Sequence, residues 1–122
     1  MGNNNGSIVS NIYWEFSGKV YNNLKDFRQA VIDYNKEIET IIEDSDLKID
    51  DICINRRFIT IKYDNEYFDE YVNVTLFADN GKNFTTKELL WKLHNWIVKR
   101  NALKHHIYFE GLEPTGELHL GS

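Results

Sequence analysis

Alternation of apolar and polar residues is the clearest pattern along this chain, and it is most regular over residues 62–78. A period of two indicates a β-strand with one face in a core and the other in water. Tyrosine and aspartate dominate the water face, which favours a surface that binds another molecule. The apolar even positions are Phe68, Val72, Val74 and Leu76, and the odd positions carry Tyr67, Asp69, Tyr71 and Asn73.

The rest of the chain divides into strand-like and helix-like segments. Residues 24–43 repeat apolar side chains every three or four positions, which predicts an amphipathic helix with Asn23 as its N-cap. Thr85–Glu88 reads as a capping box before a second helix, whose apolar stripe runs from Leu89 to Ile97. Strands are predicted over 8–16, 52–63, 107–112 and 117–120.

Turn residues predict how these strands pair. Asp64–Asn65 suggests a two-residue turn, which would place Ile61 opposite Phe68. The phase of apolar residues slips near Asn55–Arg57, so we expect a bulge there. A four-residue loop at the end of the chain would place Phe109 opposite Leu120, Gly111 opposite Leu118 and Glu110 opposite His119.

The predicted order of elements is β-α-β-β-α-β-β, which is an α+β fold. We expect one domain over residues 1–122, with 1–7 as a flexible lead-in. Its mainly antiparallel sheet would carry both helices on one face and leave the other face open. The first six elements match the ferredoxin-like order, and a meandering sheet with helices packed on it is the alternative.

Composition and charge narrow the possible functions. The 122 residues are 42% hydrophobic and 14% aromatic, which is typical of a globular domain. The net charge of −5 argues against nucleic acid or an anionic membrane as the main partner. The single cysteine, Cys53, excludes an internal disulfide and fits a cytosolic location. No apolar run reaches membrane-spanning length, and the first residues lack the features of a signal peptide.

No motif for catalysis, a metal or a cofactor stands out. Glu110 with His119 is the one candidate acid–base pair, and an ordinary cross-strand polar pair is the competing interpretation. The adjacent residues His105 and His106 point to opposite faces of a strand, so they do not form a metal site. We expect Cys53 to be unreactive, since no cationic cluster adjoins it. His94 and Trp91 are placed at the flank of the second helix, where Trp91 could also mark a contact surface.

The outer face of the sheet is the stronger candidate site. Tyrosine offers a large, rigid contact area, and carboxylates pair with Arg or Lys on a partner. A solvated face and a face covered by a second copy of the chain are the alternatives. The candidate partner-binding residues are Tyr13, Glu15, Asp64, Glu66, Tyr67, Asp69, Glu70 and Tyr71.

The chain resembles the small immunity proteins of bacterial toxin systems, including those of contact-dependent growth inhibition. The resemblance rests on its acidic α+β character, its Asn/Lys/Ile-rich composition and the C-terminal stretch from His105 to Ser122. It implies a tight cytosolic complex with a cognate toxin, often a basic nuclease, and carries over no site residue. A small hydrolase-like enzyme using Glu110 and His119, or a self-associating homodimer, remain as alternatives.

Overall fold

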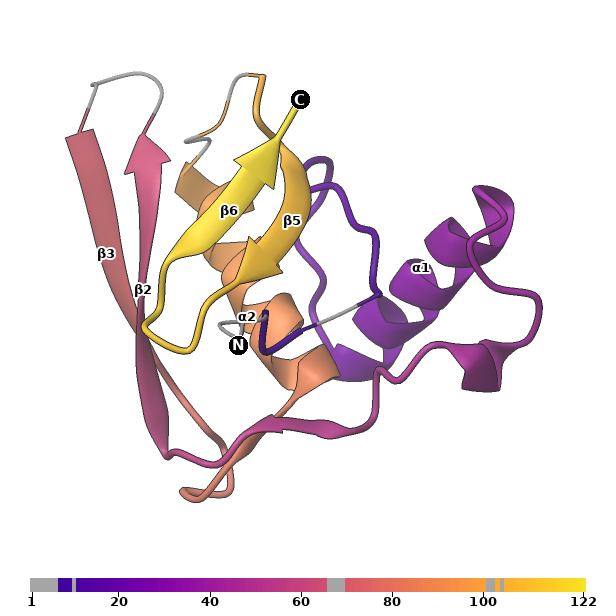
Figure 1. The fold of residues 1–122 in the computed structure, drawn as a ribbon, viewed down its shortest axis with the longest axis horizontal. Helices are drawn as coiled ribbons and strands as arrows, with labels where there is room; N and C mark the ends of the chain where they lie inside the picture. The colour runs from indigo at the N-terminus through magenta and orange to yellow at the C-terminus, as the bar shows by residue number, and fades with distance from the viewer. Residues whose placement is uncertain (1–6, 10, 66–69, 101–102, 104) are drawn as a thin grey trace, which may run out of the picture.

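The structure is a computed structural model that describes residues 7–9, 11–65, 70–100, 103 and 105–122. This part of the chain forms two α-helices and six short strands (Figure 1), which confirms the α+β class. The elements are α1 (Leu24–Glu37), β1 (Ile52–Ile54), β2 (Phe58–Asn65), β3 (Glu70–Phe77), β4 (Phe84–Thr85), α2 (Thr86–Arg100), β5 (Tyr108–Leu112) and β6 (Leu118–Gly121), with a short 3-10 turn at Asp44–Asp46.

Within the described residues the strands form three antiparallel pairs, β1–β4, β2–β3 and β5–β6, in place of one regular sheet. A single parallel bridge from Lys62 to Glu117 joins β2 to β6. The described residues of the segment 8–16 run antiparallel along the other side of β5, where Glu15 bridges Tyr108. The lateral order is therefore 8–16, β5, β6, β2, β3. The ferredoxin-like order is not observed, because there the first strand lies inside the sheet.

The alternation predicted the faces correctly over residues 12–16 but not a regular strand, and Val9, expected on the outward side, is buried. Ile12 and Trp14 are buried while Tyr13 is exposed. Main-chain bonds tie the segment to β5, from Phe109 N to Trp14 O at 2.9 Å and from Phe16 N to Ile107 O at 2.8 Å. Asn11 has a φ of 59°, a left-handed conformation that interrupts the extended backbone and keeps the segment from forming a full ladder.

Helix α1 begins as predicted and ends earlier. Asn23 accepts a hydrogen bond from Asp26 N at 2.8 Å, which confirms the N-cap. The predicted end at residue 43 is wrong, because the helix stops at Glu37. Thr40 donates from both its backbone N–H and its hydroxyl to Asn35 O, each at 3.0 Å, and so draws the chain back over the last turn. Glu39 turns the backbone with a φ of 62°.

The β2–β3 hairpin has the predicted faces in a different register. Ile61 pairs with Val74, so its predicted partner Phe68 is wrong. The ladder closes at Asn65 opposite Glu70, and residues 66–69 between them lie outside the described part. The two registers differ by an even number of residues, and an even shift keeps every side chain on its face. Ile61 and Val74 are accordingly buried.

The predicted strand over residues 52–63 is divided in two. Residues 55–57 leave the extended ladder where the bulge was expected. The piece before them, β1, pairs with β4, and the piece after them, β2, pairs with β3. The single bulged strand is therefore wrong, because its two halves belong to different sheets.

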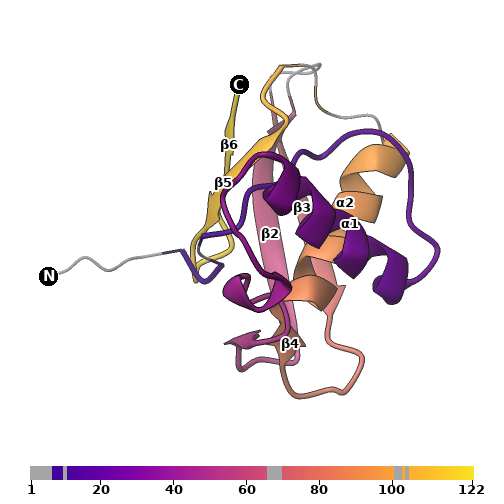
Figure 2. The ribbon, with the colours of Figure 1, turned by 90° about the vertical axis from the view of Figure 1, so that its right-hand side faces the viewer.

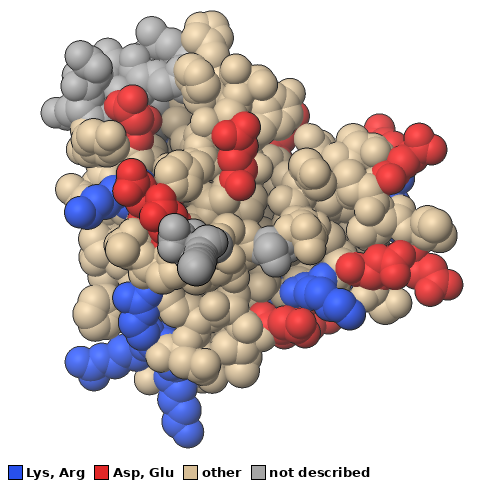
Figure 3. All heavy atoms as spheres, in the orientation of Figure 1, with Lys and Arg blue, Asp and Glu red and all other residues tan. Residues whose placement is uncertain are grey.

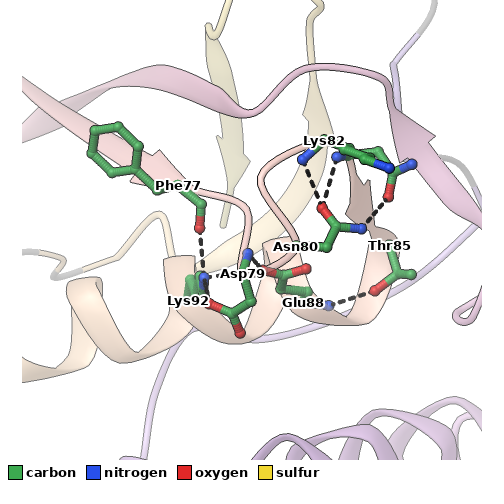
Figure 4. A network of polar contacts seen from close by, with 8 residues as sticks. Phe77, Asp79, Asn80, Lys82, Thr85, Glu88 and Lys92 are labelled. Carbon is green, nitrogen blue, oxygen red and sulfur yellow. Dashed lines mark hydrogen bonds and ion pairs between the residues drawn. The ribbon is translucent and has the colours of Figure 1, made fainter.

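A polar network fixes the end of β3 against α2 (Figure 4). The Thr85 hydroxyl accepts from Glu88 N at 3.3 Å, as the capping box predicted. The Glu88 carboxylate instead accepts from Asp79 N at 2.8 Å and pairs with Lys92. Lys92 also bonds Phe77 O and Asp79. Partial burial opposes the charge of Lys92, but its hydrogen bonds to the two carboxylates raise its pKa above the ordinary value.

Both helices lie on one side of the layer formed by β5, β6 and β2, as predicted (Figure 2). Asp50 links them, since it binds Arg28 on α1 and Lys87 on α2. Hydrogen bonds from Arg28 and then Lys87 hold the pKa of Asp50 well below its usual range.

His94 lies at the centre of the aromatic core, so its predicted place at a helix flank is wrong. Its side chain is fully buried among Trp14, Tyr21 and Phe27. Trp14 Nε1 donates to His94 Nδ1 at 3.1 Å, and His94 Nε2 lies 2.8 Å from Lys19 O. This arrangement requires the neutral ring, with the proton on Nε2.

Candidate functional site

The two hairpins β2–β3 and β5–β6 meet at a close contact of their backbones. Lys62 N donates to Gly116 O at 2.8 Å. Gly116 has a φ of 101°, and a Cβ at this position would lie 1.9 Å from Thr60 O. Only glycine fits both the conformation and the space. This contact sets Glu117 beside Lys62 and fixes the distance between the hairpins.

A groove opens between the outer face of β2–β3 and β6. One part has a volume of about 280 Å³ and is lined by Asp64, Tyr71, His106, Glu117 and His119 together with two leucines. The adjoining part, of about 360 Å³, adds Lys62 and Asn73 and shares Tyr71 and Glu117. These residues define the inter-hairpin groove, and each of its walls comes from a different hairpin.

The groove carries two carboxylates, Asp64 and Glu117, and one lysine, Lys62. Tyr71 is 69% exposed, and so most of its ring is available for contact. On the face drawn in Figure 3, acidic side chains lie over the upper part of β2, β3 and β6, whereas Lys and Arg gather at the lower left, where β2 begins. The groove thus offers an aromatic ring together with two carboxylates, a combination that suits Lys or Arg on a partner.

The predicted binding residues do not form one patch. Asp64 and Tyr71 line the inter-hairpin groove. Tyr13 and Glu15 lie on the far side of β5 and β6, where Glu15 bridges Tyr108. Glu66, Tyr67 and Asp69 lie outside the described residues, as does the side chain of Glu70, whose backbone begins β3.

A second acidic aromatic cluster surrounds Glu15. Tyr13 is 54% exposed there, and its backbone N–H donates to the buried Asn35 side chain at 3.1 Å. Burial raises the pKa of Tyr34, and the nearby Glu15 and Tyr108 raise it further. This cluster is anchored to α1, whereas the inter-hairpin groove has no wall from either helix.

The C-terminal hairpin confirms one predicted pair and overturns two. Phe109 lies opposite Leu120 as expected. The register then shifts at Glu110, so that Gly111 faces His119 and Leu112 faces Leu118. The extra residue breaks the predicted pairing of Glu110 with His119, and His119 Nε2 instead contacts the Glu113 carboxylate. The predicted cross-strand pair of Glu110 and His119 is therefore wrong.

Glu117, His106 and His119 line the groove, although the sequence did not predict them as groove residues. The sequence indicated His119 only as half of an acid–base pair and His106 only as a residue unsuited to a metal site, and it gave Glu117 no role. Their approach to Asp64 and Tyr71 depends on the Gly116 contact, which no local pattern encodes. The glycine in the loop from Glu113 to Gly116 was the one available signal.

A second hollow, of about 570 Å³, lies between α2 and the last residues of β3. Leu76, Trp91 and Trp96 line it, and Lys99 and Arg100 stand at its rim. The Arg100 guanidinium stacks on the Trp96 ring, with Cζ 3.1 Å from the ring centroid. Trp91 Nε1 donates to Tyr21 O at 2.9 Å, and part of its ring faces the hollow.

The chain matches no family model, and comparisons with characterised proteins and with solved structures give no match either. Among the described helices, none has the length and apolar character needed to cross a bilayer. The described His, Cys, Asp and Glu residues do not come together in threes as metal ligands would. Function is therefore inferred from the geometry and charge of the inter-hairpin groove.

Cys53 is expected to react slowly with thiol reagents. Burial is the main cause that raises its pKa to about 11, so almost none of it is thiolate at neutral pH. We expect its reaction with a disulfide reagent at pH 7.4 to be about 100-fold slower than that of free cysteine. The same measurement in denaturant should restore the rate of a free thiol. Fast labelling of the folded protein would contradict the burial of Cys53.

Proposed function

We propose that this chain is an immunity-type binding protein that neutralises a basic toxin domain in the cytosol. The observation that carries the proposal is the inter-hairpin groove, where the exposed Tyr71 lines the same space as Asp64 and Glu117. Its acidic side chains come from both hairpins, Asp64 from β2 and Glu117 from the residue before β6. Such a surface is suited to gripping a protruding basic segment of a macromolecule.

The chemistry of the groove supports a cationic partner. A Lys or Arg side chain entering between Asp64 and Glu117 would find two carboxylates and the face of Tyr71 within its reach. Lys62 already stands beside Glu117, and so the partner's cation would compete with it. The net charge of −5 would speed the encounter with a basic protein at low salt.

The resemblance to immunity proteins suggests which kind of protein the partner is and what binding would do to it. Proteins of that kind bind their toxin tightly and block its active site or substrate path. A nuclease toxin presents a basic surface to its nucleic acid substrate, and an acidic groove is complementary to that surface. The second acidic cluster, at Tyr13 and Glu15, would extend the contact if the partner reaches across β5 and β6.

Co-expression identifies the partner. The chain is expressed with each neighbouring coding sequence of its source, and toxicity and co-purification are measured. We expect one neighbour to be toxic alone, harmless with this chain, and recovered in a complex with it. If no neighbour is toxic and none co-purifies, the proposed function is wrong.

Charge reversal then locates the binding surface. Asp64→Lys and Glu117→Lys should each weaken the complex by about 10- to 100-fold, since a like charge replaces a salt-bridge partner. Titration calorimetry with the purified partner measures the change. Glu37→Lys on α1 is the matched control, because it changes the net charge equally and lies away from the groove. An equal loss in the control would indicate only long-range attraction and would exclude the groove as the site.

A further inference from the structure

The outer edge of β3 has unpaired backbone groups. Ala78 N donates to Arg57 O at 2.8 Å, which sets the phase of the β2–β3 ladder. In that phase Val72 and Val74 bond to β2, while Tyr71, Asn73 and Thr75 point their N–H and C=O groups away from it. Among the described residues no hydrogen bond reaches these outward groups. At the end of the strand, Lys92 takes up the carbonyl of Phe77.

The strand also lacks the features that usually protect an edge. From Tyr71 to Phe77 it contains no charged residue, proline or glycine, and its pairing with β2 has no bulge. Long, regular and uncharged edges pair readily with another strand. Figure 1 shows β3 at the outer side of the molecule, with no further strand beyond it among the described residues.

The centre of β3, Val72-Asn73-Val74, is symmetric about Asn73. In an antiparallel pair of two β3 strands centred there, Val72 lies opposite Val74 and Tyr71 lies opposite Thr75. No like charges meet in this register. The outward groups of Tyr71, Asn73 and Thr75 would form about six main-chain hydrogen bonds, two for each of three residue pairs. Each Val72–Val74 pair would lie on the helix side, beside the hollow that Leu76, Trp91 and Trp96 line.

We propose that β3 is a self-association edge. Two copies of this chain pair β3 with β3 around a two-fold axis at Asn73, which joins their hairpins into one sheet of the order β2-β3-β3-β2. The near-palindrome Val72-Asn73-Val74 selects a second copy over an unrelated strand, because both halves of the contact are then satisfied by the same residues. This inference is independent of the proposed function, since it needs no other protein.

The first test is the mass of the purified chain in solution. Sedimentation velocity from micromolar to millimolar concentration should show a shift from the chain mass of 14.4 kDa to twice that value. Asn73→Lys places two like charges at the two-fold axis and should weaken the dimer at least tenfold. Thr60→Lys is the control, since it adds the same charge to the same outer face but lies on β2. A monomer over the whole range would overturn the proposal.

Cross-linking tests the register directly. With Cys53 replaced by serine, Asn73→Cys should form an intermolecular disulfide under mild oxidation, because residues opposite one another in such a pair lie about 5.5 Å apart. Thr60→Cys should remain uncross-linked. A dimer that forms without the Asn73→Cys cross-link and tolerates Asn73→Lys would place the interface elsewhere and overturn the proposal.

Discussion

Gly116→Ala is expected to lower the free energy of unfolding by about 3–5 kcal/mol, the largest effect of an alanine at any of the described glycines. The new Cβ would lie 1.9 Å from the carbonyl oxygen of Thr60, a backbone atom that cannot turn aside. Its φ of 101° is also unfavourable for alanine. Relief requires the two hairpins to separate, which breaks the bond from Lys62 N to Gly116 O.

Thermal or urea unfolding measures this change, and Gly81→Ala is the matched control. Gly81 also has a positive φ, of 72°, but a Cβ added there would meet nothing within 4 Å. The control should therefore cost only about 1 kcal/mol. Because separation also reshapes the inter-hairpin groove, Gly116→Ala should weaken partner binding while Gly81→Ala leaves it intact. Equal stability of the two variants would show that the hairpins are not in contact at Gly116.

His94→Phe is expected to lower the free energy of unfolding by about 2–4 kcal/mol although a phenyl ring has a similar size. The substitution leaves Trp14 Nε1–H and the Lys19 carbonyl without the partners that His94 supplies. Trp14 and Lys19 belong to the segment that His94 bonds to α2, so the substitution should weaken the packing of that segment on the helix. His119→Gln, at an exposed histidine, is the control and should change stability little.

The same residue makes stability depend on pH. Burial lowers the pKa of His94 below its ordinary value of 6.5, and the hydrogen bond to Lys19 O only partly opposes this. As the pH falls below about 6.5, the unfolded chain takes up a proton that the folded chain refuses, and so stability falls. Urea unfolding at pH 7.5 and pH 5 should show this loss in the natural chain and in His119→Gln. In His94→Phe the difference in unfolding free energy between pH 7.5 and pH 5 should be smaller, because the part due to His94 is gone. An unchanged difference would contradict a neutral, buried His94 ring.

The two proposed surfaces use different atoms of Tyr71. Its side chain lines the inter-hairpin groove, whereas its backbone N–H and C=O lie on the open edge of β3. A substitution such as Tyr71→Ser removes the ring and keeps the edge groups. Binding to a partner and pairing of two copies can therefore be separated by variants at one short strand.

Local patterns predicted much of the fold. The alternation over residues 12–16 and 71–77 identified which side chains face the core, because that periodicity reflects a buried face wherever the strand finally pairs. It placed Val9 on the outward side, and that prediction is wrong. The Asn23 cap and the Thr85 hydroxyl contact were also predicted, since each involves residues three apart on the chain. In the β2–β3 hairpin each side chain kept its predicted face, because the observed register differs from the predicted one by an even number of residues.

Pairing and register were not predictable in the same way. The two-residue turn at Asp64–Asn65 was a sound local choice, but the ladder continues to Asn65 opposite Glu70, which leaves four residues between the strands. Because Glu110 is an extra residue in the ladder, His119 lies opposite Gly111 and its side chain contacts the Glu113 carboxylate, whereas the sequence predicted a pair with Glu110. The apolar pattern predicts a helix beyond Glu37, but the helix stops there, where Thr40 donates hydrogen bonds back to Asn35.

By itself, then, the sequence determined the α+β class, the inward and outward residues and the acidic character of the surface, because each depends on neighbours along the chain. Only the tertiary structure decided that Glu117 stands beside Lys62 and Tyr71, that His94 is buried and that β3 ends the described sheet. Those features depend on contacts between segments far apart in sequence, such as Gly116 with Lys62, whose geometry is fixed by packing and by the space that a missing side chain leaves.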